Sequence, residues 1–164
     1  MRDIPEESKV QALLSKLNQA LVAQDIKKIL SLFLEDCYWR DLVAFTWNIK
    51  TMEGNTAVGD MLSSQLACAK PENFKLHFDR KVSSENGVTT AWITFETAVA
   101  RCEGQIRIKE EKIWTLLTSM VELKGHEEPL GTNRPMGTKH GSNGNQLTWQ
   151  EQQEKEKTEL GSKI

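Results

Sequence analysis

The residues best suited to chemistry lie in one stretch, Asp36 to Gly54, which reads DCYWRDLVAFTWNIKTMEG. If residues 37–43 form an extended strand, successive side chains point to opposite faces. One face then carries Cys37, Trp39, Asp41 and Val43. Burying a carboxylate beside an indole on an apolar face is unfavourable unless the charge is compensated. The pattern therefore indicates either a pocket around Asp41 or a buried partner for its carboxylate.

The structural alternative for Asp41 is an ion pair with a cation such as Arg40 or Lys50, or hydrogen bonds from backbone N–H groups. Aromatic side chains within and beyond the stretch are the candidate lining of a pocket. These are Tyr38, Trp39, Trp47, Trp92 and Trp114. Core packing or a dimer interface is the alternative role for at least two of the tryptophans.

Metal, thiol and nucleotide chemistry have little support. His77, His126 and His140 are widely separated, without carboxylates at ligand spacing, and do not predict a metal site. The three cysteines lack a basic neighbour that would activate a thiolate. No GxGxxG motif is present, so we expect no flavin or nicotinamide cofactor bound in the Rossmann manner.

Composition narrows the class of partner and the compartment. The chain has 164 residues, a net charge of −2 and no broad basic region, which argues against a nucleic-acid partner. The N-terminus lacks the pattern of a signal peptide, and no apolar run reaches membrane-spanning length. We therefore expect a cytoplasmic protein with no membrane contact.

Periodicity predicts helices first and strands afterwards. Helices are expected from Asp3, from Asp25 and from Asn55 or Thr56, with Pro71 ending the third. Strands are expected over residues 74–78, 88–100, 105–109 and 113–123, with a turn at 83–87 and a turn or bulge at 103–104. This order predicts an α+β architecture with helices packed on a curved antiparallel sheet.

The predicted strands are apolar on both faces. In the last strand Ile113, Leu117, Val121 and Leu123 would lie opposite Trp114, Leu116 and Met120. One face should pack against the helices, and the other should contact a partner or line a cavity. We therefore expect a homodimer formed through the sheet, with a small apolar ligand as a second possible partner. If residue 92 lies beside the final strand, Trp92 and Trp114 would be neighbours.

The composition changes at Gly125, where glycine and proline replace aliphatic residues. This predicts a folded domain over 1–124, followed at 125–164 by an arm and a polar helix. Thr148 and Glu151 form a capping box for that helix.

The order of elements and the aromatic strand DCYWRD resemble the nuclear transport factor 2-like (SnoaL-like) superfamily. That stretch, together with KIWTLLTSMVELKGHEEPLG, RPMGTKHG and TWQEQQEKEKTELG, is also similar to the N-terminal region of a group of flavin-dependent monooxygenases. The resemblance implies a cystatin-like cone, whose strongly bent sheet wraps a long helix, and a homodimer through the sheet. The chain stops about where the first flavin-binding strand of those enzymes would begin.

Two functions are consistent with this resemblance. The first is a dimerising or small-ligand-binding module without chemistry of its own. The second is a cofactor-free isomerase, cyclase or dehydratase acting on an apolar carbonyl compound. The resemblance makes Asp41 its general base, helped by a second polar group such as Tyr38, His77 or Glu96.

Overall fold

The computed structural model describes residues 6–134, 137 and 147–161, which form two compact units, Met1–Glu128 and Pro129–Ile164. The first unit extends slightly past the boundary expected at residue 125. The expected start of the first helix at Asp3 lies outside the described residues, as does His140. Among the described residues, no helix is long and apolar enough to cross a membrane.

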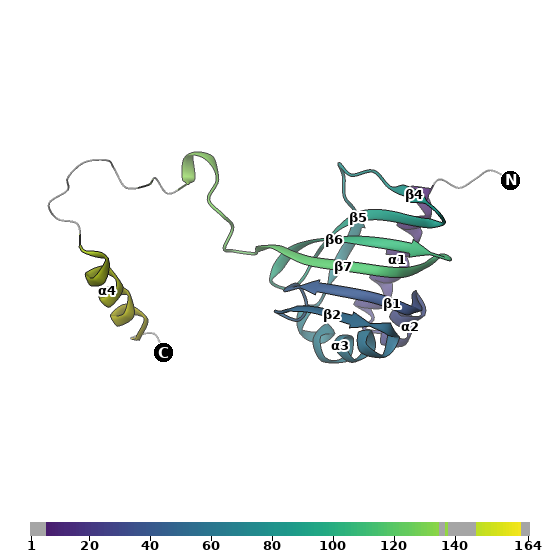
Figure 1. The fold of residues 1–164 in the computed structure, drawn as a ribbon, viewed down its shortest axis with the longest axis horizontal. Coiled ribbons are helices and arrows are strands. Elements are labelled where there is room, and N and C mark those ends of the chain that lie inside the picture. Colours follow the sequence, from purple (N-terminus) through teal and green to yellow (C-terminus); the bar gives the residue numbers. More distant parts are fainter. Residues whose placement is uncertain (1–5, 135–136, 138–146, 162–164) are drawn as a thin grey trace. The chain divides into compact units, whose positions relative to one another are not determined.

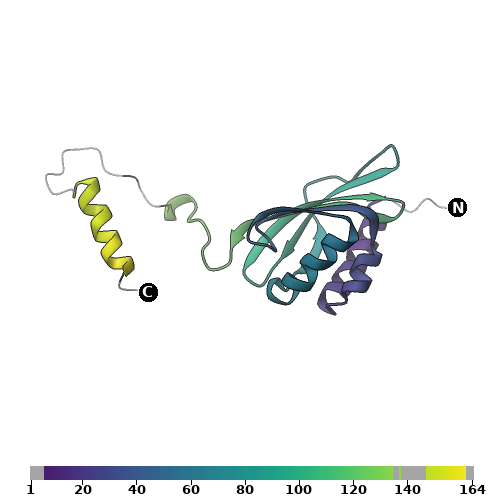
Figure 2. The ribbon, with the colours of Figure 1, turned by 60° about the horizontal axis from the view of Figure 1, so that its bottom comes forward.

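Three helices cover one face of the sheet in the first unit (Figures 1 and 2). They are α1 (Glu6–Val22), α2 (Ile26–Ser31) and α3 (Gly54–Ala69). The Asp25 side chain accepts a hydrogen bond from Lys28 N at 3.0 Å, which confirms the predicted cap of α2. The predicted cap of α3 was wrong by two or three residues, because Glu53 is the N-cap and the helix begins at Gly54, where positive φ suits glycine.

Seven strands form a single sheet in the order β2-β1-β7-β6-β5-β3, with β4 paired to β5. Their bounds are β1 (Phe33–Leu42), β2 (Ile49–Glu53), β3 (Glu72–Leu76), β4 (Ser83–Glu85), β5 (Val88–Glu96), β6 (Ala100–Lys109) and β7 (Lys112–Leu123). All pairs are antiparallel except β1 with β7, which run parallel. The observed architecture is therefore the expected α+β cystatin-like fold, with a mixed and mostly antiparallel curved sheet.

Two predicted turns require correction. Asn86 and Gly87 both have positive φ and close the β4–β5 hairpin, but Ser83–Glu85 is itself a strand. The predicted turn at 103–104 is wrong, because Gly104 lies inside β6 and the chain reverses between β5 and β6 instead. A Cβ on Gly104 would lie 2.2 Å from Leu117 O, so glycine is required by close strand approach rather than by a turn.

The sheet has two faces with different neighbours. We call the face packed on α1–α3 the inner face and the opposite one the outer face. The inner face carries the buried core, including Cys37, Trp39, Asp41, Ile93, Phe95, Ile106, Leu116 and Thr118. The alternation predicted for β1 is confirmed as far as Asp41, although the strand ends at Leu42 and Val43 has left-handed φ.

The predicted faces of β7 were wrong because of a β-bulge. Ile108 pairs with Ile113 but Arg107 pairs with Thr115, which leaves Trp114 as the extra residue. Ile113 and Leu116 are consequently both buried, whereas Leu117 lies on the outer face. The inserted residue reverses the assignment of the following side chains until a second irregularity at Val121, because Cys102 pairs with Met120 and Arg101 with Glu122.

Candidate functional site

The Asp41 carboxylate lies on the inner face at the end of β1 and is completely buried. Its Oδ2 accepts hydrogen bonds from Phe45 N at 3.0 Å, Thr46 N at 2.8 Å and Thr46 Oγ1 at 2.8 Å. Its Oδ1 accepts one from Thr118 Oγ1 at 2.7 Å and a longer one from Phe45 N at 3.2 Å. We call these residues, with Trp39, the Asp41 cluster.

Trp39 joins the Asp41 cluster through the neighbouring strand. The parallel register of β1 and β7 places Asp41 beside Thr118. The indole Nε1 of Trp39 donates to Thr118 Oγ1 at 2.9 Å, so the threonine hydroxyl accepts from Trp39 and donates to Asp41. The Thr118 hydroxyl thus provides a hydrogen-bond acceptor for the buried indole N–H and a donor for the buried carboxylate.

The donors to Asp41 are all neutral. A carboxylate has about four lone-pair sites, and four donor groups converge on this one. Hydrogen bonds from oriented N–H and O–H groups replace the water that the charge loses on burial. Of the structural alternatives considered, the backbone hydrogen bonds are observed, and neither Arg40 nor Lys50 makes an ion pair with Asp41 among the described contacts.

Aromatic rings fill the space between the helices and the inner face. Trp39 stacks on Phe33 with centroids 5.8 Å apart and meets Phe45 edge-on at 5.1 Å. Phe95 stacks on Phe74 at 4.4 Å. These rings are almost completely buried, so the protein's own side chains occupy the region in which a ligand would contact Trp39.

The structure does not bring the five aromatic candidates together. Trp39 alone is on the inner face. Tyr38 lies on the outer face of β1, and Trp47 lies in the β1–β2 loop, 60% exposed. Trp92 and Trp114 are half-buried on the outer face. Because β6 lies between their strands, the pairing that would have made them neighbours does not occur.

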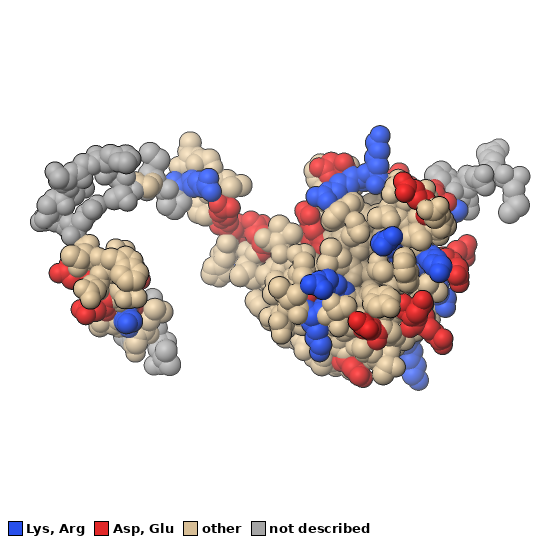
Figure 3. All heavy atoms as spheres, viewed as in Figure 1, with Lys and Arg blue, Asp and Glu red and all other residues tan. Residues whose placement is uncertain are grey.

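Cationic side chains cover the two outer-face tryptophans. The Arg80 guanidinium lies 4.2 Å from the ring centroid of Trp92, and the Arg107 guanidinium lies 5.1 Å from that of Trp114. Such contacts shield part of each ring while the cation keeps its contact with water. In Figure 3, uncharged surface alternates with separate basic and acidic side chains.

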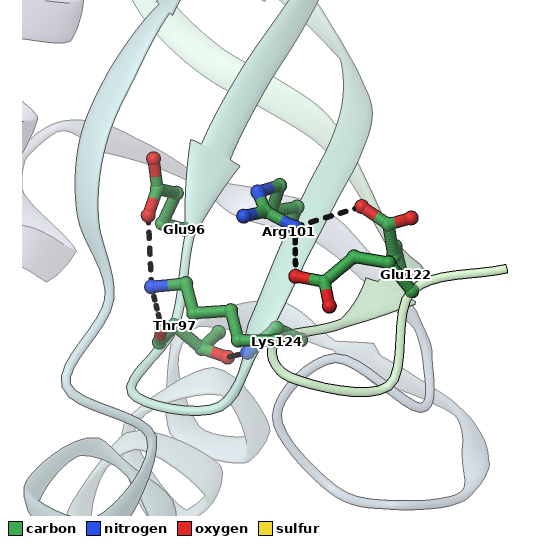
Figure 4. Close-up of polar contacts among 7 residues, drawn as sticks. Glu96, Thr97, Arg101, Glu122 and Lys124 are labelled. Atoms are coloured by element: carbon green, nitrogen blue, oxygen red, sulfur yellow. Dashed lines mark hydrogen bonds and ion pairs between the residues drawn. The ribbon is translucent and has the colours of Figure 1, made fainter. Parts of the chain in front are cut away.

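None of the three proposed partners for an acid–base pair contacts Asp41, and Tyr38 lies on the outer face. His77 is held beside the outer face, where Nδ1 lies 2.5 Å from Asp79 Oδ1 and Nε2 lies 3.6 Å from Glu103 Oε1. Glu96 Oε2 forms an ion pair with Lys124 Nζ at 2.8 Å, and the same lysine donates a hydrogen bond to Thr97 O (Figure 4). Beside it, Arg101 binds Glu122 at 2.8 Å and Glu127 at 2.9 Å.

The thiols are separated and mostly inert. Burial raises the pKa of the Cys102 thiol to about 12 and also raises the pKa of Cys37, whereas Cys68 is exposed on α3. A thiol held in its protonated form is a poor nucleophile and a poor metal ligand. In the part of the chain that the structure describes, no group of three His, Cys, Asp or Glu side chains could hold a metal ion.

The sequence reasoning missed Thr46 and Thr118, the two hydroxyl groups of the Asp41 cluster. Thr46 follows Asp41 by five residues in a loop, a pattern in which a carboxylate commonly accepts backbone and hydroxyl donors. No local sequence pattern indicates Thr118. Its contact with Asp41, 77 residues away in the chain, depends on the pairing of β1 with β7.

Comparison with known proteins supports the fold. No family model and no curated protein sequence matches the chain. A cystatin-like domain of unknown function from Nostoc punctiforme aligns with a TM-score of 0.58 and 12% identity, covering 73% of this chain and 80% of that one. A candidate polyketide cyclase from Sinorhizobium meliloti aligns at 0.50 and 10% identity, covering 70% and 99%.

A protein of unknown function from Cytophaga hutchinsonii, described as nuclear transport factor 2-like, aligns at a TM-score of 0.46 and 13% identity, covering 74% of this chain and 95% of that one. Identities this low establish a shared fold and nothing further. The chain therefore shares the cystatin-like fold of the Nostoc domain.

Proposed function

We propose that this chain is a dimerising module of the nuclear transport factor 2-like fold, which holds a partner in place and turns over no substrate itself. The observation that carries the proposal is the filled interior. Aromatic rings pack around Trp39, and the hydrogen-bonding capacity of Asp41 is used within the protein. A general base needs a lone pair that can reach a substrate proton.

The outer face is the surface proposed for a second copy. Six strands about 4.8 Å apart, each contributing about 20 Å of length, make a face of roughly 500 Å² before side-chain relief is counted. This area approaches the roughly 800 Å² per partner of a standard interface. Tyr38, Leu42, Trp92, Trp114 and Leu117 supply its uncharged part.

The charges on this face suit a two-fold arrangement. Arg40 and Arg107 lie on the same face as Glu103, so each copy offers both signs to the other. A face with one sign only would repel its own copy, whereas a mixed face can be self-complementary.

The test places a charge at the centre of the outer face. Leu117→Arg in the full chain should convert a dimer to a monomer in sedimentation velocity, because the buried guanidinium would meet its symmetry mate. Val22→Arg is the matched control, because Val22 is 73% exposed at the end of α1 and should leave the dimer intact. A wild-type chain that sediments as a monomer at all concentrations would contradict the proposal.

The alternative is a cofactor-free isomerase, cyclase or dehydratase with Asp41 as general base. The shared fold with a candidate polyketide cyclase is the observation in its favour. It requires Asp41 to lose its donors on substrate binding, and Asp41→Asn would then abolish turnover without a large loss of stability. The dimerising module predicts the opposite, a large loss of stability.

We also infer a relationship to the N-terminal region of flavin-dependent monooxygenases, which would make a flavoenzyme domain the partner that the module positions. The support is the sequence resemblance over DCYWRDLVAFTWNIKTMEG and the C-terminal stretches. The reading frame beyond Ile164 tests it: a glycine-rich βαβ unit downstream is expected, and an unrelated or terminated frame would contradict the relationship.

A further inference from the structure

A groove lies between the β1–β2 loop, strand β2 and helix α3, away from the filled interior. Its volume is about 460 Å³, within the range of small-molecule sites. Its floor contains Met52 and Met61, which are 2% and 4% exposed, and its rim contains Asn48, Lys50, Asp60 and Gln65. An apolar floor with a few convergent polar groups is typical of a ligand site.

The loop that forms one wall has an unusual backbone. Val43 and Trp47 have φ of 57° and 53°, a left-handed conformation that β-branched and bulky residues rarely adopt. Asp41 holds the loop in this conformation through Phe45 N and Thr46 N, and Val43 N donates to Asn48 O at 3.1 Å. Strain maintained by surrounding contacts is concentrated at functional sites.

Lys50 supplies a cation to the groove. It pairs with Asp41 in the β1–β2 register and therefore lies on the same side of the sheet. Because neutral donors already satisfy Asp41, Lys50 is not used to neutralise it. No ion pair of Lys50 or of Asp60 occurs within the described ranges, so both charges are available to a ligand.

Side-chain amides add donors beside the lysine. Asn48 Oδ1 accepts from Ile49 N at 2.8 Å, which directs its NH₂ group away from that bond. Gln65 Nε2 makes only a long contact of 3.5 Å with Ser64 Oγ. Lysine and amide donors together suit a carboxylate, while Asp60 accepts from a hydroxyl or amino group.

We propose that this groove binds a small carboxylate with an apolar body and one hydrogen-bond donor, such as a hydroxy or amino acid. Lys50 and Asn48 hold the carboxylate, and Asp60 accepts from the donor group. The apolar body lies against Ala57 and the small exposed parts of Met52 and Met61. This site is separate from the dimer interface and does not depend on it.

The first experiment titrates the full chain with three probes and uses its amide chemical shifts to measure binding. Two of the probes each lack one polar group of the first. Phenyllactate carries both polar groups, phenylpropionate lacks the hydroxyl, and phenylethanol lacks the carboxylate. Phenyllactate should give saturable shifts in the β1–β2 loop and the middle of α3, phenylpropionate should bind about fivefold more weakly, and phenylethanol should not saturate.

Variants then assign the groups. Lys50→Met should weaken phenyllactate binding about tenfold, the effect of one charge-assisted hydrogen bond, whereas Lys27→Met, an exposed lysine on α2, should leave it unchanged. Asp60→Ala should remove the preference for phenyllactate over phenylpropionate. Melting temperatures verify that each variant is folded.

Three results would overturn the proposal: no saturable shift with phenyllactate, saturable shifts confined to other surfaces, or unaltered affinity in Lys50→Met. Leu117→Arg should bind phenyllactate as the unmodified chain does. A failure of dimerisation is thereby distinguished from a failure of the groove.

Discussion

Trp39 and Trp92 lie on opposite faces of one sheet and are stabilised in different ways. Trp39 is completely buried, stacks on Phe33 and donates its indole N–H to Thr118. Trp92 is half-buried beneath the guanidinium of Arg80, which lies 4.2 Å from the ring centroid. The inner face excludes water and satisfies polar groups with neutral donors, whereas the outer face uses charges in contact with solvent.

The difference separates a structural region from the surface proposed for a second copy. On the inner face each polar group is tied to the packing, so removing one leaves its partner buried and unsatisfied. On the outer face the ion pairs and cation–π contacts are weakened by water, and their loss has a small effect on the fold. Substitutions on the outer face and on the groove rim should therefore affect folding less than substitutions around Asp41.

The largest expected effect on stability is at Trp39, and Trp92 is its comparison on the outer face. Trp39→Ala should lower the free energy of unfolding by about 4 kcal/mol, because it leaves a cavity and removes the donor to Thr118. Trp92→Ala should lower it by less than about 1 kcal/mol in the monomer. Urea denaturation of both variants, each in the Leu117→Arg background, measures the difference; equal losses would mean that the two faces are not distinct.

A change at Asp41 should be almost as large. Asp41→Asn should lower the free energy of unfolding by about 3 kcal/mol, because its NH₂ group would face the donors of Phe45 and Thr46. Asp79→Asn on the outer side should change it by less than about 1 kcal/mol. Chemical denaturation of both variants gives the comparison, and an unchanged or raised stability in Asp41→Asn would favour a catalytic carboxylate.

Thiol reactivity sharpens the comparison without a mutation. At pH 8, a Cys102 thiol with a pKa of about 12 is ionised only to about one part in ten thousand. Ellman's reagent should therefore label Cys68 rapidly and leave Cys37 and Cys102 unreacted until the protein unfolds. Because folding raises the pKa of Cys102, its contribution to stability is present below pH 9 and is lost as the pH rises toward 12. Rapid labelling of more than one thiol in the native protein would contradict a sealed inner face.

The smallest expected effect on stability is that of the ion pair between Arg101 and Glu127. The Arg101 guanidinium holds the pKa of Glu127 down to about 2. A lowered carboxyl pKa stabilises the contact above pH 4.5, and this contribution is lost as the pH falls toward 2. The Glu127 carboxyl should titrate near pH 2 in the wild type and at a clearly higher pH in Arg101→Gln, where only the backbone hydrogen bonds still lower its pKa. The same midpoint in both proteins would show that the ion pair does not form in solution.

Local signals predicted the elements that depend on near neighbours. Asp25 caps α2, Asn86 and Gly87 form the hairpin turn, and Thr148 N donates to Glu151 at 2.7 Å in the predicted capping box of α4 (Trp149–Gly161). The turn expected at 103–104 failed because a glycine in a strand interior and a glycine in a turn are indistinguishable locally.

The sequence by itself determined that Cys37, Trp39 and Asp41 share a buried face, because the two-residue period of a strand follows from its backbone geometry. Only the tertiary structure decided what Asp41 meets. Its partner Thr118 comes from a strand 77 residues away, and the bulge at Trp114 sets which side chains of β7 lie on that face. Strand register depends on the packing of the whole sheet, and no local pattern encodes it.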